Sequence, residues 1–260
     1  MQVKDKVIVV TGGASGIGAA LCRRFHREGA RAVVAADLNG VGARQVAQEI
    51  GGIGIQTDVA LESDLIRLVQ ETENQCGPID LFCSNAGVSY RDEPHGTAAS
   101  CANEGWQKAW EINVMAHVYA ARAVLPGMIA RGAGYFLNTV SAAGLLNQIG
   151  SASYSTTKHA AIGFAESLAI THGDDGIKVS VLCPQAVDTP LLGGFTGGGP
   201  QGVDGIITPQ AVAESVIAGL AAETFLILPH EKVRLYMQRK ISDYDRWLKG
   251  MRRLRQSFAE

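Results

Sequence analysis

The feature that most constrains the fold of this chain is the regular alternation of short β-branched runs with longer amphipathic segments. Helical spacing is clear at residues 16–29 and 110–132. Alternation of this kind predicts a parallel sheet covered by helices on both faces, so we expect an α/β, doubly wound sheet of seven strands. The predicted strands are residues 6–10, 31–37, 52–59, 79–87, 134–141, 177–184 and 225–229.

No linker, charge block or repeat divides the 260 residues, which predicts a single domain over residues 1–260. Residues 188–209 are so rich in glycine that neither helix nor strand is favoured, which indicates either a substrate loop or a disordered surface excursion. Residues 231–260 predict an amphipathic helical extension. It holds nine Lys/Arg against four Asp/Glu, which leaves 14 against 21 for residues 1–230.

Composition excludes several classes of protein. With 47% hydrophobic residues and a net charge of −2, the chain can bury a core and has no general attraction to nucleic acid or to acidic membranes. Five cysteines without C-x-x-C spacing and six histidines without a ligand pattern predict neither disulfides nor a metal site. The N-terminus lacks the apolar stretch of a signal peptide and no run approaches 18 apolar residues, so we expect a cytoplasmic protein.

A glycine-rich turn, T-G-G-A-S-G-I-G, follows the first predicted strand and places glycine at Gly12, Gly16 and Gly18. Such a turn lets the backbone approach a pyrophosphate, which the amides of the next helix then stabilise. Asp37 ends the second strand 19 residues after Gly18, where a carboxylate can accept hydrogen bonds from ribose hydroxyls and would repel a 2′-phosphate. This favours NAD over NADP, although Asp37 could instead cap the turn before Asn39.

With these motifs the chain resembles the short-chain dehydrogenase/reductase family over residues 3–230. The further motifs that carry the resemblance are Asp58-Val59, the S-N-A-G strand end at 84–87, Asn113, Ser141 and Y-S-T-T-K at 154–158. The resemblance implies a Rossmann fold and hydride transfer between NAD(H) and a secondary alcohol or ketone. It implies the catalytic residues Asn113, Ser141, Tyr154 and Lys158. It implies cofactor contacts at Gly12, Ser15, Gly16, Ile17, Gly18, Asp37, Leu38, Asp58, Val59, Asn85, Ala86, Gly87, Tyr154, Lys158, Pro184, Val187 and Thr189.

Tyr154 and Lys158 stand one helical turn apart, so they lie on one face. A free tyrosine, with a pKa of about 10, is a poor base at neutral pH. We expect the Lys158 ammonium and the charge of oxidised nicotinamide to lower the pKa of Tyr154 by about three units. By the resemblance, Ser141 binds the substrate oxygen, Asn113 holds a water that links Lys158 to solvent, and Lys158 also bonds the nicotinamide ribose. His159 points about 100° away from Lys158 and is expected to be surface or core filler.

The segments expected to wall the substrate pocket carry no Arg or Lys, which favours a hydrophobic, uncharged substrate. The family usually has Pro-Gly after the sixth strand, whereas this chain has Pro184-Gln185. The long amide of Gln185 could restrict the pocket, bond a substrate oxygen, or turn to solvent. The predicted substrate residues are Ala143, Gln148, Gln185, Leu191 and Leu192, with further wall residues at Ala142, Leu145, Leu146, Val187 and Phe195.

The C-terminal extension carries an apolar stripe at helical spacing, which favours packing on a partner subunit or covering a pocket over binding a nucleic acid or a membrane. The resemblance implies a homo-oligomer, a tetramer or a dimer. An NADP-dependent 3-oxoacyl-type ketoreductase and a non-catalytic dinucleotide-binding regulator stay open as alternatives, and the complete catalytic set argues against the second. The stripe consists of Val233, Met237, Tyr244, Trp247, Leu248, Met251 and Leu254.

Overall fold

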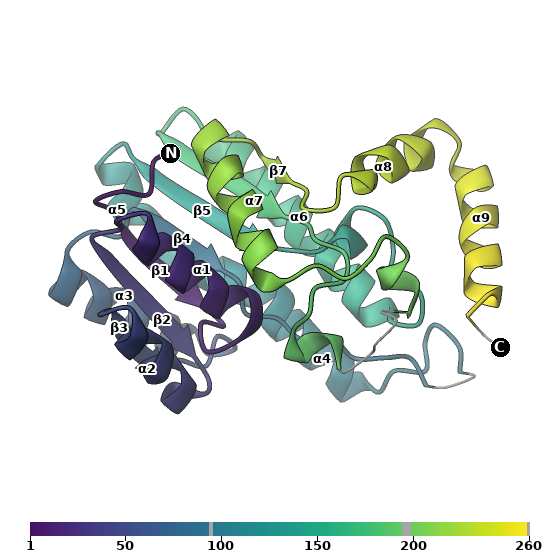
Figure 1. Ribbon diagram of the computed structural model, residues 1–260, viewed down its shortest axis with the longest axis horizontal. Helices are drawn as coiled ribbons and strands as arrows, with labels where there is room; N and C mark the ends of the chain where they lie inside the picture. The colour runs from purple at the N-terminus through teal and green to yellow at the C-terminus, as the bar shows by residue number, and fades with distance from the viewer. Residues whose placement is uncertain (94–95, 194–198, 259–260) are drawn as a thin grey trace.

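The computed structural model describes residues 1–93, 96–193 and 199–258, and it is built on one parallel sheet (Figure 1). The strand order is β3-β2-β1-β4-β5-β6-β7, which confirms the predicted seven-stranded, doubly wound sheet. The strands are β1 (Val7–Thr11), β2 (Ala32–Asp37), β3 (Ile53–Gln56), β4 (Leu81–Ser84), β5 (Gly134–Thr139), β6 (Ile177–Leu182) and β7 (Leu226–Ile227).

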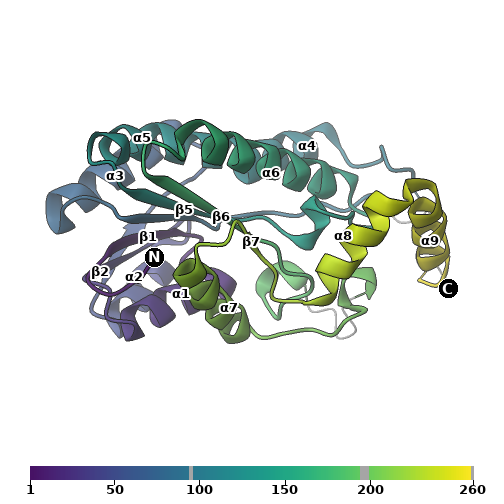
Figure 2. The ribbon, with the colours of Figure 1, turned by 90° about the horizontal axis from the view of Figure 1, so that it is seen from above.

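Helices cover both faces of the sheet, and Figure 2 shows the two layers edge-on. One layer contains α3 (Glu62–Cys76), α5 (Ala116–Ala130) and α6 (Ala152–His172). The other contains α1 (Gly16–Arg27), α2 (Gly40–Glu49) and α7 (Pro209–Ala222).

Each strand feeds two hydrophobic cores because successive side chains point to opposite faces. In β1, Val7 and Val9 enter the core under α3, α5 and α6, whereas Ile8 and Val10 enter the core under α1 and α7. All five residues of β1 are buried, which is why the central strands read as continuous apolar runs.

The winding of the sheet reverses at β1, which pairs with β2 on one side and with β4 on the other. Val10 is level with Ala35 of β2 and with Cys83 of β4, so the loops after these three strands begin at the same edge. The loops after β1 and β4 lead to opposite faces, which opens a crevice at the carboxyl ends of the strands.

A long helical run crosses the sheet as α4 (Asn103–Trp110), a π-helical turn at Glu111–Met115, and α5. Of the helices in the described part of the chain, this run alone is long and apolar enough, by length and composition, to cross a membrane. Its inward side, including Ala109, Ala120 and Val124, is buried against the sheet, as in the core helix of a globular domain.

The chain beyond β6 builds the other side of the crevice. An irregular segment with 3-10 turns at Pro190–Leu192 and Gly199–Gly202 follows β6, and a bridge between Val187 and Ile207 brings its two ends together. Phe195 lies outside the described residues. After β7 the chain leaves the sheet and ends in α8 (Lys232–Ser242) and α9 (Tyr244–Gln256), which stand at the far end of the molecule (Figure 1).

Candidate active site

A large cavity of about 1530 Å³ lies at the carboxyl edge of the sheet. We call the part around Gly12, Asp37 and Asp58 its cofactor end, and the part between the segment after β6 and α8–α9 its substrate end. Two predicted site residues, Gly18 and Asn113, do not line it. The predicted residues that do are Gly12, Ser15, Gly16, Ile17, Asp37, Leu38, Asp58, Val59, Asn85, Ala86, Gly87, Ser141, Ala143, Gln148, Tyr154, Lys158, Pro184, Gln185, Val187, Thr189, Leu191 and Leu192.

The glycine turn forms a close-packed floor at the cofactor end. Gly12 and Gly16 have φ of +66° and +51°, a conformation that L side chains rarely adopt. A Cβ on Gly16 would lie 3.0 Å from Thr189 Cγ2, and a Cβ on Gly18 would lie 2.0 Å from the Gly12 carbonyl oxygen. Gly18 therefore supports the turn from behind. The main-chain amides at the α1 N-terminus suit a pyrophosphate, so these residues fit a dinucleotide.

Two polar side chains join the ends of β1 and β4 beneath this turn. The Thr11 hydroxyl oxygen accepts hydrogen bonds from the backbone N–H groups of Asn85 (3.0 Å) and Ala86 (3.2 Å). The Asn85 amide donates to the Thr11 carbonyl (3.0 Å) and accepts from Thr139 Oγ1 of β5 (3.0 Å). These bonds fix three strand ends relative to one another. The strand β4 stops at Ser84, three residues before the predicted end at residue 87, and Asn85 and Ala86 bond to Thr11 instead.

Asp37 both lines the cavity and caps a turn. Its carboxylate accepts backbone hydrogen bonds from Ala14 (3.0 Å) and Asn39 (2.9 Å), so the capping alternative is correct as well. Each carboxylate oxygen keeps a lone pair for a ribose hydroxyl. No Lys or Arg from the ends of β1, β2 or β3 lines the cavity beside it.

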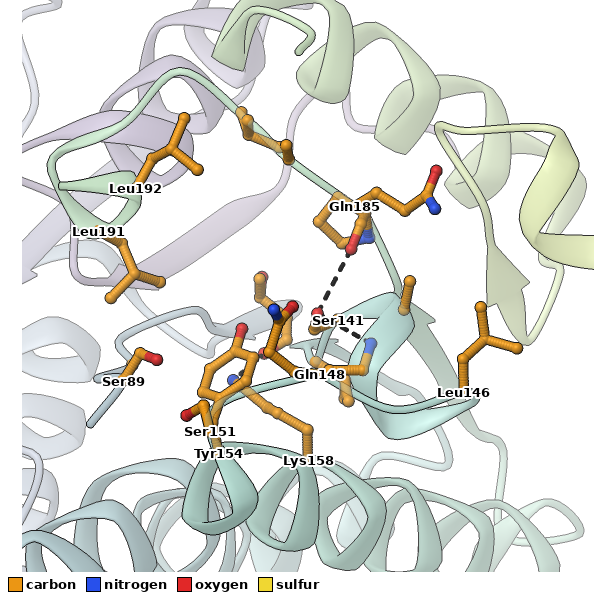
Figure 3. Close-up of a pocket in the computed structure, with 18 of the residues that line it drawn as sticks. Ser89, Ser141, Leu146, Gln148, Ser151, Tyr154, Lys158, Gln185, Leu191 and Leu192 are labelled. Atoms are coloured by element: carbon orange, nitrogen blue, oxygen red, sulfur yellow. Dashed lines mark hydrogen bonds between the residues drawn. The ribbon is translucent and has the colours of Figure 1, made fainter. Parts of the chain in front are cut away.

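Tyr154, Lys158 and Ser141 converge at the middle of the cavity (Figure 3). Tyr154 and Lys158 both come from α6, and the Lys158 Nζ lies 5.5 Å from the centre of the Tyr154 ring. The same Nζ donates to the Thr139 carbonyl at 3.1 Å. Ser141 follows β5, and its Oγ accepts from the Ala143 N–H at 3.1 Å. Three groups able to handle a substrate hydroxyl thus face one space.

Burial dominates the electrostatics of this pair. Desolvation lowers the pKa of Lys158 to about 8, and the Cys183 thiol acts in the opposite direction. Desolvation likewise raises the pKa of Tyr154, against a lowering by its hydrogen bond to Ser141. Burial therefore acts on Tyr154 in the direction opposite to the one expected from Lys158 and oxidised nicotinamide together, and the lowering of the pKa of Tyr154 by these two charges stays a prediction.

Asn113 lies in the π-helical turn at Glu111–Met115 and is fully buried. Its Oδ1 accepts from the Val88 N–H (2.9 Å), and its Nδ2 donates to the Val88 carbonyl (2.9 Å) and to Thr157 Oγ1 (3.1 Å). The side chain thereby ties the loop after β4 to α6, one residue before Lys158. Its predicted role in holding a water stays a prediction.

Gln185 lines the cavity, but its side chain points away from Tyr154 and Ser141 (Figure 3). Its backbone N–H donates to Nδ1 of His230, in the segment after β7, at 3.1 Å. The Oε1 atom is buried without a hydrogen-bond partner among the described residues. Gln185 therefore does not reach the reacting oxygen. Leu145, expected on the pocket wall, packs against the core instead.

The substrate end includes residues that were not predicted there. The segments after β5 and β6 were expected to wall the pocket, whereas residues of the C-terminal helices line the cavity as well. The apolar stripe of α9 was the signal in the sequence that could have placed these residues at the cavity. It had suggested, as one alternative, that the C-terminal extension covers a pocket. The lining residues from these helices are Tyr236, Arg239, Ser242, Asp243, Arg246, Trp247, Gly250, Met251, Arg253 and Leu254.

A buried lysine attaches these helices to the body of the molecule. The Lys240 Nζ donates to the carbonyls of Leu145 (2.9 Å) and Leu146 (3.0 Å), in the loop that starts at Ser141. It also lies over the rings of Tyr244 (5.5 Å) and Trp247 (5.0 Å). His159 faces this lysine, with its Nε2 3.5 Å from Nζ, so it takes no part at Tyr154.

A second attachment joins α8 to the segment after β6. The Asp204 Oδ1 accepts hydrogen bonds from Lys232 Nζ (2.9 Å) and from the Tyr236 hydroxyl (3.0 Å). The side chain of Asp204 is 7% exposed. Burial acts to raise the pKa of Asp204, but its hydrogen bonds lower it, so the carboxylate stays ionised.

Comparison with known proteins agrees with this geometry. The family model described as short chain dehydrogenase matches residues 6–196. A 1-deoxy-11-beta-hydroxypentalenate dehydrogenase of Streptomyces exfoliatus is 35% identical over 251 residues, 94% of this chain and 90% of that protein. A cis-4-hydroxycyclohexanecarboxylate dehydrogenase of Sinomonas cyclohexanicum is 33% identical over 230 residues, 84% of this chain and 90% of that protein. The structure of a 3-ketoacyl-(acyl-carrier-protein) reductase from Brucella melitensis complexed with NADH superposes with a TM-score of 0.77 at 26% identity, covering 87% of this chain and 96% of that one.

Proposed function

The chain belongs to the short chain dehydrogenase family, and we propose on that basis that it transfers a hydride between NAD(H) and a secondary alcohol or ketone with a hydrophobic body. The observation that carries the proposal is the position of Tyr154, Lys158 and Ser141 in one cavity with the glycine turn and Asp37. The alcohol dehydrogenases among its relatives support the same reaction class.

The side chains supply the proton chemistry. When bound at the cofactor end, the nicotinamide would accept or supply the hydride. Ser141 would donate a hydrogen bond to the substrate oxygen and stabilise the charge that develops there. Tyr154 would take the hydroxyl proton in oxidation and return it in reduction, a role worth about 10²- to 10⁴-fold in rate. Because burial raises the pKa of Tyr154, the positive charge of the oxidised cofactor would be needed to favour the phenolate.

The preference for NAD over NADP rests on Asp37. Its carboxylate faces the cavity at the end of β2, and no basic residue from the neighbouring strand ends lines the cavity beside it. A 2′-phosphate placed there would be repelled. The NADH found in the Brucella melitensis reductase is consistent with this choice.

The test is a screen of apolar secondary alcohols with NAD⁺ and with NADP⁺, read as reduced-nicotinamide absorbance. We expect oxidation with NAD⁺ and at least tenfold weaker activity with NADP⁺. Faster turnover with NADP⁺, or activity confined to NADPH and a 3-oxoacyl thioester, would favour the ketoreductase alternative. NADH binding without turnover of any alcohol or ketone would favour the non-catalytic regulator.

We also propose that the enzyme is a homo-oligomer that works in the cytoplasm. Exposed apolar side chains on the layer of α4, α5 and α6 support the assembly: Trp110, Ile129 and Ile170 are 46%, 36% and 83% exposed. Five free cysteines suit a reducing compartment. Light scattering of the purified protein and fractionation of cells test the two statements. A monomer would refute the first, and recovery in a secreted or membrane fraction would refute the second.

A further inference from the structure

The substrate end of the cavity carries three guanidinium groups. Arg239 of α8 and Arg246 and Arg253 of α9 line the same cavity as Tyr154. Arg246 and Arg253 are seven residues apart, about two helical turns, so they share one face of α9. The other cations of α9 do not line the cavity, and they are Lys249, Arg252 and Arg255.

Apolar side chains lie between these arginines and on the opposite wall. Trp247, Met251 and Leu254 form a partly buried strip along the inner face of α9. The cavity wall also carries the aliphatic side chains of Leu146, Ile149, Leu191 and Leu192, next to a few neutral polar ones such as Asn147 and Gln148. The cavity that holds both Tyr154 and the arginines is therefore lined in large part by apolar side chains.

The charge of this wall is not balanced by the protein. Among the described residues, no ion pair includes Arg239, Arg246 or Arg253. The ion pairs of the described chain are formed by other cations, such as Arg24, Lys178 and Lys232. Asp243 is the one carboxylate that lines this end in the described chain, and it accepts the Arg246 N–H at 2.9 Å as the N-cap of α9. The wall keeps a net positive charge. Arg239, Arg246 and Arg253 are exposed, so an anion that enters the cavity can reach their guanidinium groups from solvent.

The helices that carry the three arginines are held in place by other residues, which do not belong to the arginine wall. Lys240 holds the junction of α8 and α9 against the loop that carries Ser141, and Asp204 holds the start of α8. The guanidinium groups thus stand on an anchored support rather than on a loose terminus.

We propose that the substrate is a hydroxy acid, in which an apolar body joins the secondary alcohol to a carboxylate that Arg239, Arg246 and Arg253 bind. This inference rests on the proposed function. Guanidinium groups bind carboxylates through paired hydrogen bonds, which would orient the alcohol carbon toward the cofactor. In oxidation the Tyr154 phenolate would take the hydroxyl proton and bound NAD⁺ would accept the hydride from the alcohol carbon, while the carboxylate would keep its charge and the oxo acid would leave.

The experiment compares secondary hydroxy acids with their neutral primary amides, using 4-hydroxycyclohexanecarboxylate and 9-hydroxydecanoate as probes. In the unaltered enzyme we expect kcat/KM for an acid to exceed that for its amide by about tenfold or more. Arg246→Gln should lower kcat/KM for the acid about tenfold, mainly through KM, and leave the amide unchanged. Arg239→Gln and Arg253→Gln should act in the same direction. Arg252→Gln, on the outer face of α9, is the matched control and should behave as the unaltered enzyme.

A binding assay separates this inference from the proposed function. Quenching of tryptophan fluorescence reports the binding of cyclohexanecarboxylate and of its amide to the NADH complex without turnover. Selective binding of the acid that Arg246→Gln removes, in a protein that oxidises no alcohol, would support the arginine site and refute the enzyme assignment. Oxidation of amides as fast as acids, or equal losses in Arg246→Gln and Arg252→Gln, would overturn the arginine site and leave the enzyme assignment intact.

Discussion

The two ends of the cavity are built in different ways. The cofactor end consists of strand ends, a glycine turn and main-chain amides, and its polar side chains, such as Thr11 and Asn85, are bonded to neighbouring strands. The substrate end lies between the segment after β6 and two helices that leave the sheet after β7. Lys240 attaches these helices to the loop after β5, and Asp204 attaches them to the segment after β6. The sheet thus determines the first end, whereas two polar attachments determine the second, and each can be altered alone.

Tyr154 lies where the two ends meet, so removing its hydroxyl should have the largest effect. We expect Tyr154→Phe to lower kcat by about 10³-fold, because it deletes the proposed acid and base, and to leave the affinity for NADH within twofold. Steady-state kinetics and NADH fluorescence titration measure the two quantities. Tyr119→Phe, outside the cavity, is the control. A variant that kept more than a tenth of kcat would contradict the role of the phenol.

Gly18→Ala should break the cofactor end alone. The added Cβ would lie 2.0 Å from the Gly12 carbonyl oxygen, a backbone atom that cannot move without opening the turn. We expect NADH affinity to fall at least tenfold and the free energy of unfolding to fall by about 2 kcal/mol. Gly163→Ala, on α6 with nothing within 4 Å of its added Cβ, should be neutral or stabilising by up to about 1 kcal/mol. Equal behaviour of the two variants would refute the packing argument.

Lys158→Met tests the cost of a buried charge near the cofactor end. Burial lowers the pKa of Lys158 from 10.5 to about 8, so below pH 8 the folded protein holds the charge at a cost. Between pH 8 and 10.5 the unfolded chain binds more protons, and stability rises with pH. Removing the lysine should therefore abolish activity yet stabilise the protein by roughly 2 kcal/mol at pH 7, and less at pH 10.

Denaturant titrations at both pH values measure this effect. Arg246→Met, at the exposed substrate end, is the control and should show no such dependence on pH. A Lys158→Met variant less stable than the unaltered protein at pH 7 would show that the Thr139 hydrogen bond outweighs desolvation.

Lys240→Met should give the smallest effect and should confine it to the substrate end. Without its bonds to Leu145 and Leu146 the C-terminal helices would lose their attachment, and we expect KM for the alcohol to rise about threefold to tenfold with NADH affinity unchanged. Hydrogen exchange of residues 232–256 should quicken. Lys249→Met, which touches neither loop nor cavity, is the control. An equal loss of NADH affinity would show that the two ends are not independent.

The difference between the cofactor end and the substrate end also explains which features could be predicted from the sequence. The seven strands were predictable because buried parallel strands are continuous apolar runs, and the glycine turn because its conformation favours glycine. The hydrogen bond from the Gln185 backbone N–H to His230, 45 residues further along the chain, was not predictable, because no local pattern indicates it. Helical spacing identified the inner face of α9 but not the body it covers, so its arginines were missed. The π-helical turn around Asn113 could not be predicted either, because the spacing of apolar residues there does not differ from that of an α-helix.

The bridge between Val187 and Ile207 makes the segment after β6 a closed excursion. Asp188 N–H donates to the Ile207 carbonyl (3.0 Å), and Ile207 N–H donates to the Ala186 carbonyl (3.2 Å), so the chain enters and leaves at one point. Residues inserted between these positions would not change the path of β6 or α7. Because the entropy of closing a loop grows slowly, each doubling of its length costs only about 0.6 kcal/mol. A change of length within the segment that spares Thr189 and Asp204 would therefore reshape the substrate end while β6 and α7 keep their places.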